Sequence, residues 1–211
     1  MQMRDNARTI LFAAVLGIIC SIMLAGANLF TAPYRLANEK AEEVRNFLAA
    51  LEVPVSAEAD SKTLLEIFNR DIKVLELGKL TLYEYRPETS EKPIALAAPF
   101  SGSGLWGPVK GVLALEPDLL TIRGVRFYQQ EETPGLGGEI GSAWFQEQFT
   151  GKEIVSGDGK PGFRVLKPGG TADRNSVDGI TGATMTSDRT KIIKVLRLRG
   201  EHNWKIHWSW A

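Results

Sequence analysis

The sequence predicts an α+β protein in which one transmembrane helix is followed by one domain with a mostly antiparallel sheet packed by helices. Two observations support this fold class. Residues 10–30 contain no charged side chain, and about 20 apolar residues suffice for a helix to cross a bilayer. Strand and helix patterns then mix over residues 71–211 without the regular βαβ order of a doubly wound sheet.

Composition excludes several classes of function. The 25 basic and 25 acidic residues balance, so nothing indicates a nucleic-acid partner. The single cysteine, Cys20, excludes an internal disulfide and a cysteine-cluster zinc site. Only two histidines are present, His202 and His207, and no nucleophile–base motif occurs. We therefore predict neither a metal site nor catalytic side chains.

The N-terminus predicts a membrane anchor, with residues 1–9 as a cytoplasmic tail and residues 10–30 as the transmembrane helix. Arg4 and Arg8 lie on the short side, and long domains translocate largely regardless of their charge. We expect a single-pass protein of the bacterial inner membrane, in contact with lipid, whose main domain is periplasmic. A cleaved signal peptide ending at residues 25–27 is the alternative, although the apolar stretch exceeds a usual signal core.

Residues 31–70 are predicted to form a juxtamembrane helical region. Apolar residues recur at helical spacing over residues 33–51, and Pro54 ends that pattern. A second helix is predicted over residues 62–69, with Asp60 or Ser61 as its N-cap.

Residues 71–211 are predicted to form the main domain. A β pattern covers residues 73–85, and two further strands, 109–115 and 120–129, flank a turn, with a possible bulge at Gly124. The remaining predictions are a helix over residues 142–150 with Trp144, Phe145 and Phe149 on its apolar side, loops over 151–159 and 167–177, a short strand over 162–166, and a helix over 185–199. Tryptophans alternate with polar residues over 204–210, which favours an edge strand on the domain's own sheet; a docking face for a partner or the membrane is the alternative.

Residues 178–184 form a turn of small residues that presents the hydroxyl of Thr184 just before the predicted helix. Such a hydroxyl is accessible to another enzyme, and a phosphate attached there would lie beside the N–H groups of a helix start. The alternative is an ordinary helix N-terminus capped by Thr184, Thr186 or Ser187.

A second cluster, residues 131–139, has three glycines within four residues. Glycines let a backbone approach a planar ligand closely and expose its N–H groups. An ordinary turn after the preceding strand would explain one or two of these glycines and the proline.

Both clusters resemble one family. Asp178-Gly179-Ile180-Thr181-Gly182-Ala183-Thr184 is similar to the flavinylation motif of FMN-binding subunits, namely the C subunit of the sodium-translocating NADH:quinone oxidoreductase and the related G subunit of the Rnf complex. The run Glu132-Thr133-Pro134-Gly135-Leu136-Gly137 resembles a segment that lies against the flavin in the same families. Gly104-Leu105-Trp106 and the continuation to Glu139 are closer to the sodium-pump protein. The resemblance covers residues 101–196 and does not extend to the tryptophan-rich C-terminus.

The resemblance implies that residues 71–211 are an FMN-binding domain. FMN would be bound covalently to Thr184 through a phosphoester that a separate flavin transferase makes. Asp178 and Gly179 would help the transferase recognise the site, and Thr181, Gly182 and Ala183 would shape the turn. The first candidates for contacts around the flavin are Trp106, Glu132, Thr133, Gly135, Leu136 and Gly137.

The function implied is electron relay within a membrane NADH:quinone reductase of the sodium-translocating type, together with the other subunits of that redox complex. The chain would belong to an enzyme without being an autonomous catalyst. An Rnf-type G subunit or another extracytoplasmic flavin carrier is the alternative, and a non-redox, membrane-anchored binding domain is a third class.

Overall fold

The protein is known from a computed structural model, which describes residues 2–56, 58–77, 80–156, 162–182, 193–197 and 204–208. The chain divides into two compact units, Met1–Ala41 and Glu42–Ala211. The first unit is helical, and its apolar side chains between residues 10 and 30 are exposed. Among the described residues, one helix is long and apolar enough to cross a membrane.

That helix is α1 (Gln2–Ala50), so the two helices predicted over residues 10–30 and 33–51 are continuous. Pro33 lies inside α1 and does not separate them. A proline removes one backbone donor, and in a helix this long the hydrogen bonds of the neighbouring turns keep the chain helical on either side. The second helix, α2 (Ser61–Asp71), is capped as predicted: the backbone N–H of Thr63 donates to Asp60 Oδ1 (2.9 Å).

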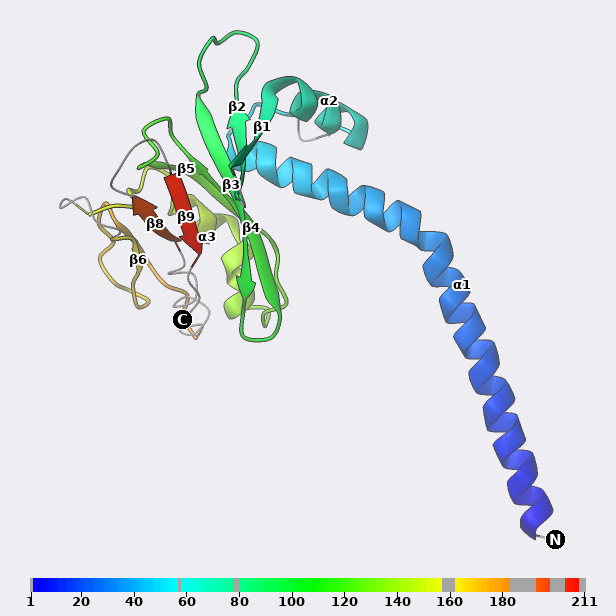
Figure 1. Ribbon diagram of the computed structural model, residues 1–211. Coiled ribbons are helices and arrows are strands. Elements are labelled where there is room, and N and C mark those ends of the chain that lie inside the picture. The colour runs from blue at the N-terminus through cyan, green and yellow to red at the C-terminus, as the bar shows by residue number, and fades with distance from the viewer. Residues whose placement is uncertain are drawn as a thin grey trace. The chain divides into compact units, whose positions relative to one another are not determined.

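A five-stranded sheet forms the centre of the second unit, in the order β1-β2-β3-β4-β5 (Figure 1). Its strands are β1 (Ile72–Leu77), β2 (Leu80–Tyr85), β3 (Ala95–Ser103), β4 (Pro108–Leu115) and β5 (Ile122–Gln129). Every pair in it is antiparallel, which confirms the predicted sheet type. Strand β3 was not predicted, because its alanines and Pro99 are poor strand formers. In the described pairing, β2 reaches β3 only at residues 95–97, so Pro99 lies beyond that pairing.

The predicted bulge is present beside Gly124. The pairs Ala114↔Gly124 and Leu115↔Ile122 leave Arg123 as the extra residue of β5. A Cβ on Gly124 would lie 2.5 Å from the carbonyl oxygen of Ala50, so only glycine lets the end of α1 lie this close to β5.

Both faces of the sheet are buried. In β4, Val109, Leu113 and Leu115 join one core cluster, whereas Val112 and Ala114 join the other. Successive side chains of a strand point to opposite faces, so the two clusters lie on opposite sides of the sheet. The Val112 side is covered by Phe47 and Leu48 at the end of α1, by Leu51 just after it, and by Leu64 of α2.

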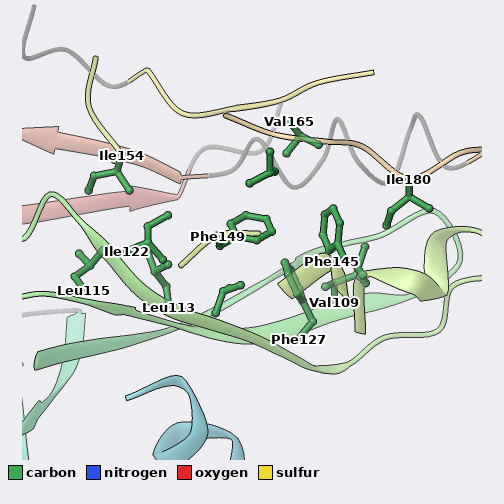
Figure 2. Packing of buried hydrophobic residues seen from close by; sticks show 13 residues of the cluster. Val109, Leu113, Leu115, Ile122, Phe127, Phe145, Phe149, Ile154, Val165 and Ile180 are labelled. Carbon is green, nitrogen blue, oxygen red and sulfur yellow. The ribbon is translucent and has the colours of Figure 1, made fainter. Parts of the chain in front are cut away.

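The Leu113 side is covered by the chain that follows β5. This part contains the 3-10 helix η1 (Gly137–Gly141), the short helix α3 (Ala143–Glu147), and the strands β6 (Arg164–Val165) and β7 (Ser176–Val177). Phe145 and Phe149 lie between the sheet residues Leu113 and Phe127 and the later residues Val165 and Ile180 (Figure 2). The chain from η1 to Ile180 thus completes this core cluster.

Several local predictions need correction. The predicted helix 142–150 is shorter in the structure, where α3 covers only Ala143–Glu147. Trp144 is 48% exposed, whereas Phe145 and Phe149 are buried. Trp144 and Phe145 face different sides because neighbouring positions of a helix differ by about 100°. Residues 176–177, predicted as loop, form β7, which pairs in parallel with β6; the latter lies in the predicted strand 162–166. The predicted helix 185–199 is wrong over residues 193–197, which form β8 (Ile193–Arg197).

The C-terminal strand is confirmed as β9 (Trp204–Trp208). It pairs antiparallel with β8 in a separate two-stranded sheet. The prediction that it forms an edge strand of the domain's main sheet is therefore wrong. A partner strand provided by its own sequence neighbour satisfies the alternating pattern equally well.

Candidate functional site

The turn between β3 and β4 is held by Glu132, a residue of the glycine-rich cluster. Glu132 is 5% exposed, and its Oε1 accepts hydrogen bonds from the backbone N–H groups of Leu105 (2.6 Å) and Trp106 (3.1 Å). The N–H of Gly104 donates to the carbonyl of Gly107 (2.7 Å) and closes the turn. The structure therefore joins two predicted site residues, Trp106 and Glu132, that are far apart in sequence.

The bond between Glu132 and this turn requires glycine at position 104. A Cβ there would lie 2.3 Å from Glu132 Oε1, within the space that the carboxylate occupies. The side chain of Trp106 is 70% exposed. The buried carboxylate thus fixes the backbone of the turn while the indole stays open to solvent.

The glycine-rich cluster forms a compact loop that leads into η1. The carbonyl of Thr133 accepts from the N–H groups of Leu136 (3.1 Å) and Gly138 (3.0 Å). Gly135 has a φ of +75°, a conformation that side chains rarely adopt, and no atom lies within 4 Å of where its Cβ would be. Gly137 is buried, whereas Leu136 is 43% exposed. Leu136 is therefore exposed on a turn that is closed by hydrogen bonds to the Thr133 carbonyl.

Leu136 also meets the predicted attachment segment. Gly182 has a φ of +73°, and a Cβ on it would lie 2.7 Å from Leu136 Cδ2. The two glycine-containing clusters, about 45 residues apart in sequence, are therefore neighbours in the folded domain. Thr181 and Gly182 are exposed at this point.

The first three residues of the predicted attachment segment, residues 178–180, are held by hydrogen bonds and packing within the domain. The N–H of Asp178 donates to Gln148 Oε1 (2.8 Å), and its carboxylate accepts from the N–H groups of Gly179 (2.9 Å) and Gly169 (3.2 Å). Gly179 lies against the backbone, because a Cβ on it would lie 2.2 Å from the carbonyl oxygen of Leu166. Ile180, 3% exposed, is part of the core.

Ala183 and Thr184, the last two residues of the predicted attachment segment, lie outside the described residues. The segment is described as far as Gly182, where it is exposed beside Leu136. The described parts of the chain contain no group of three or more His, Cys, Asp or Glu side chains that could hold a metal ion.

Asp173, in the loop before β7, has a perturbed pKa. Its Oδ1 accepts from Ser176 Oγ (2.5 Å) and from the N–H of Asn175 (2.9 Å), and its Oδ2 pairs with Arg164 (2.8 Å). The hydrogen bond from Ser176 is the main cause that lowers the pKa of Asp173 below its usual 3.8, and the bond from Asn175 is the second. A carboxylate with a lowered pKa stabilises the fold above pH 3.8 and loses this contribution as the pH falls through the lowered value.

We expect the stability difference between the wild type and Asp173→Asn to shrink as the pH falls from 5 to about 2.5, because protonation removes the advantage of the carboxylate. Guanidinium unfolding at several pH values in this range would measure it. A difference that stays constant across the range would contradict this assignment.

The sequence did not point to Gln148, Leu166 or Gly169 as parts of the site. Gln148 follows α3 and lies 30 residues before Asp178, its hydrogen-bond partner. A single glutamine at a helix end has no pattern that predicts a distant backbone partner. Only the folded domain reveals this contact.

Comparison with known proteins defines the class of this site. The model of the FMN-binding domain family matches residues 104–193, which include both glycine-containing clusters. A crystal structure of the C subunit of the Na(+)-translocating NADH-quinone reductase from Parabacteroides distasonis is 30% identical, has a TM-score of 0.60, and is matched over 73% of this chain and 86% of its own. The class is therefore that of FMN-binding domains.

Curated relatives agree with this class. The C subunit of the Na(+)-translocating NADH-quinone reductase from Neisseria meningitidis is 45% identical over 89 residues, which are 42% of this chain and 34% of the relative. The chain thus matches about a third of that relative's length. The corresponding protein of Pasteurella multocida is 27% identical over 221 residues, with 85% of each chain covered. This chain belongs to the family of those C subunits.

Proposed function

We propose that this chain carries FMN covalently on Thr184 and relays electrons as the C subunit of a sodium-translocating NADH:quinone oxidoreductase. One observation above all supports this: hydrogen bonds, close backbone packing and the burial of Ile180 hold residues 178–180, and the next two residues are exposed beside Leu136. The described part of the segment therefore ends at the surface of the domain beside the glycine-rich loop, two residues before Thr184 in the sequence. A hydroxyl that follows an exposed turn can be reached by a modifying enzyme.

The described residues fit a flavin on two counts. Trp106 and Leu136 are large apolar side chains that remain exposed on turns with fixed backbones, and a flat aromatic ring gains most from such surfaces. The space next to Gly135 is open, so a ring could approach its backbone. We assign Trp106, Glu132, Thr133, Gly135, Leu136 and Gly137 to the flavin surroundings, with Glu132 acting through the turn that it holds.

The attachment is a phosphoryl transfer that another enzyme carries out. The oxygen of the Thr184 hydroxyl forms a bond to the FMN phosphorus, the phosphoanhydride bond of a flavin dinucleotide breaks, and the hydroxyl proton leaves with the nucleoside monophosphate. Neither oxidant nor reductant is consumed. Once bound, FMN supplies the electron-transfer chemistry, and this chain supplies orientation and a tuned environment.

The same proposal places the protein in the bacterial inner membrane. Residues 10–30 of α1 would span the bilayer, residues 1–9 would be cytoplasmic, and residues 71–211 would form the FMN-binding domain on the periplasmic side. The partners are the other subunits of the complex, the flavin transferase and membrane lipid. Co-purifying subunits would distinguish this complex from an Rnf-type one.

Replacing Thr184 by alanine is expected to abolish covalent FMN, because the accepting oxygen is lost. Intact mass after denaturation measures it: the wild type, produced with a flavin transferase, gains the mass of one FMN phosphoester, and the variant gains none. Thr186→Ala is the matched control, since it removes a hydroxyl two positions away and should leave attachment complete. A flavin adduct on Thr184→Ala, or an unmodified wild type, would overturn the assignment.

A further inference from the structure

The residues before the attachment site are held by this domain itself. Both oxygens of the Asp178 carboxylate accept backbone hydrogen bonds, from Gly179 and from Gly169, so this side chain is already engaged within the fold. Gly179 has no room for a Cβ, because the carbonyl of Leu166 occupies that space. Ile180 is buried in the core. All three residues are thus committed to contacts within the domain.

Two parts of the chain that are separate in sequence from Asp178 form hydrogen bonds with it. Gln148, directly after α3, accepts the Asp178 N–H, and the turn at residues 167–170, closed by the N–H of Gly170 donating to Lys167 (3.1 Å), supplies Gly169. The N–H of Leu166 also donates to Val177 (2.8 Å), which fixes the chain just before Asp178. These contacts therefore hold the backbone at Val177 and Asp178 in one position.

We infer that Gln148 is a positioning residue for the attachment of FMN. By accepting the Asp178 N–H, it holds residues 178–180 so that the chain from Thr181 onward is presented to the transferase. The backbone hydrogen bonds of the Asp178 carboxylate and the close packing of Gly179 hold the same three residues. This inference rests on the proposed function for its link to FMN. The hydrogen bond from the Asp178 N–H to Gln148, here called the clamp, is measurable without FMN.

The clamp is a population effect. If the turn adopts its presenting conformation less often, the apparent affinity of the transferase falls by the same fraction, whereas turnover at saturation does not change. Loss of one hydrogen bond to a neutral acceptor corresponds to a factor of about 3 to 10 in such an equilibrium. We therefore expect Gln148→Leu to raise the KM for this protein as acceptor by about 3- to 10-fold with an unchanged kcat.

The experiment uses the full-length protein in detergent, a purified flavin transferase and flavin adenine dinucleotide, with attachment followed by intact mass. Gln148→Glu keeps an acceptor oxygen and is expected to restore the wild-type KM. Glu147→Leu introduces the same side chain at the neighbouring exposed position of α3 and should behave as the wild type. Equal KM values for the wild type and Gln148→Leu, or equally raised values for Gln148→Leu and Gln148→Glu, would overturn the inference.

A second measurement is independent of the flavin. In the unmodified protein, the Asp178 amide is expected to exchange with solvent about tenfold faster in Gln148→Leu than in Gln148→Glu or the wild type. Equal exchange rates would overturn the clamp, even where FMN attachment proceeds. A wild type that never acquires FMN would overturn the proposed function, and the exchange rates would still decide on the clamp.

Discussion

Gly179→Ala is expected to destabilise the domain by about 1–3 kcal/mol and to block the proposed attachment of FMN. The new Cβ would lie 2.2 Å from the backbone carbonyl oxygen of Leu166, far inside contact distance. Because the obstacle is backbone, relief requires residues 178–180 or the chain at Leu166 to shift. Ile180 would then be drawn from the core, and the exposed turn beyond it would lose its direction.

Gly141→Ala provides the matched control. A Cβ on Gly141 meets no atom closer than the carbonyl oxygen of Phe127, at 3.9 Å, which is an ordinary contact. Both substitutions add the same methyl group, and only the one at Gly179 collides with the backbone. Chemical unfolding gives the loss of stability, and intact mass gives the extent of flavin attachment. Equal stability and equal attachment in both variants would contradict the close packing of Gly179 on Leu166.

Glu132→Ala is expected to lower the free energy of unfolding by about 2–3 kcal/mol. The substitution removes a buried acceptor and leaves the N–H groups of Leu105 and Trp106 without the Glu132 side chain. The turn that carries Trp106 should then become mobile, so the circular dichroism of a flavin attached as proposed should weaken while the attached mass stays the same. If the circular dichroism falls while the attached mass stays the same, Glu132 positions the flavin ring and is not needed for its covalent linkage.

Glu131→Ala tests whether charge alone explains the result. Glu131 is the adjacent acidic residue and is exposed, so its removal should change stability by no more than about 0.5 kcal/mol. Thermal unfolding of both variants in the same detergent would measure the difference. Similar midpoints for Glu131→Ala and Glu132→Ala would show that the hydrogen bonds of Glu132 are not decisive.

Much of the fold could be predicted from local patterns. Strands β4 and β5, the Asp60 cap and the bulge beside Gly124 were all predicted, because each depends on residues close together in sequence. Strand β3 was missed because Ala95, Ala97 and Pro99 do not resemble strand formers, although small residues suit a strand that is covered on both faces. The strand β8 was mistaken for helix because its apolar and basic residues fit either period.

The site was predictable in its parts and not in its assembly. The glycines of residues 131–139 indicated a close backbone approach, residues 178–184 indicated an accessible turn, and the structure places Gly182 beside Leu136. The sequence contained no sign that Glu132 would accept from the turn before β4, or that Gln148 would hold Asp178. Such contacts join elements through the core, and single-sequence patterns carry little information about long-range partners.

The order of strands in the sheet has a consequence for how the protein matures. Every strand from β1 to β5 pairs with its neighbour in sequence, an arrangement of short loops that favours rapid formation. Val165, Val177 and Ile180 pack against residues of this sheet and of α3. We therefore expect the segment before Thr184 to dock last, so that acquisition of the cofactor would mark molecules that have finished folding.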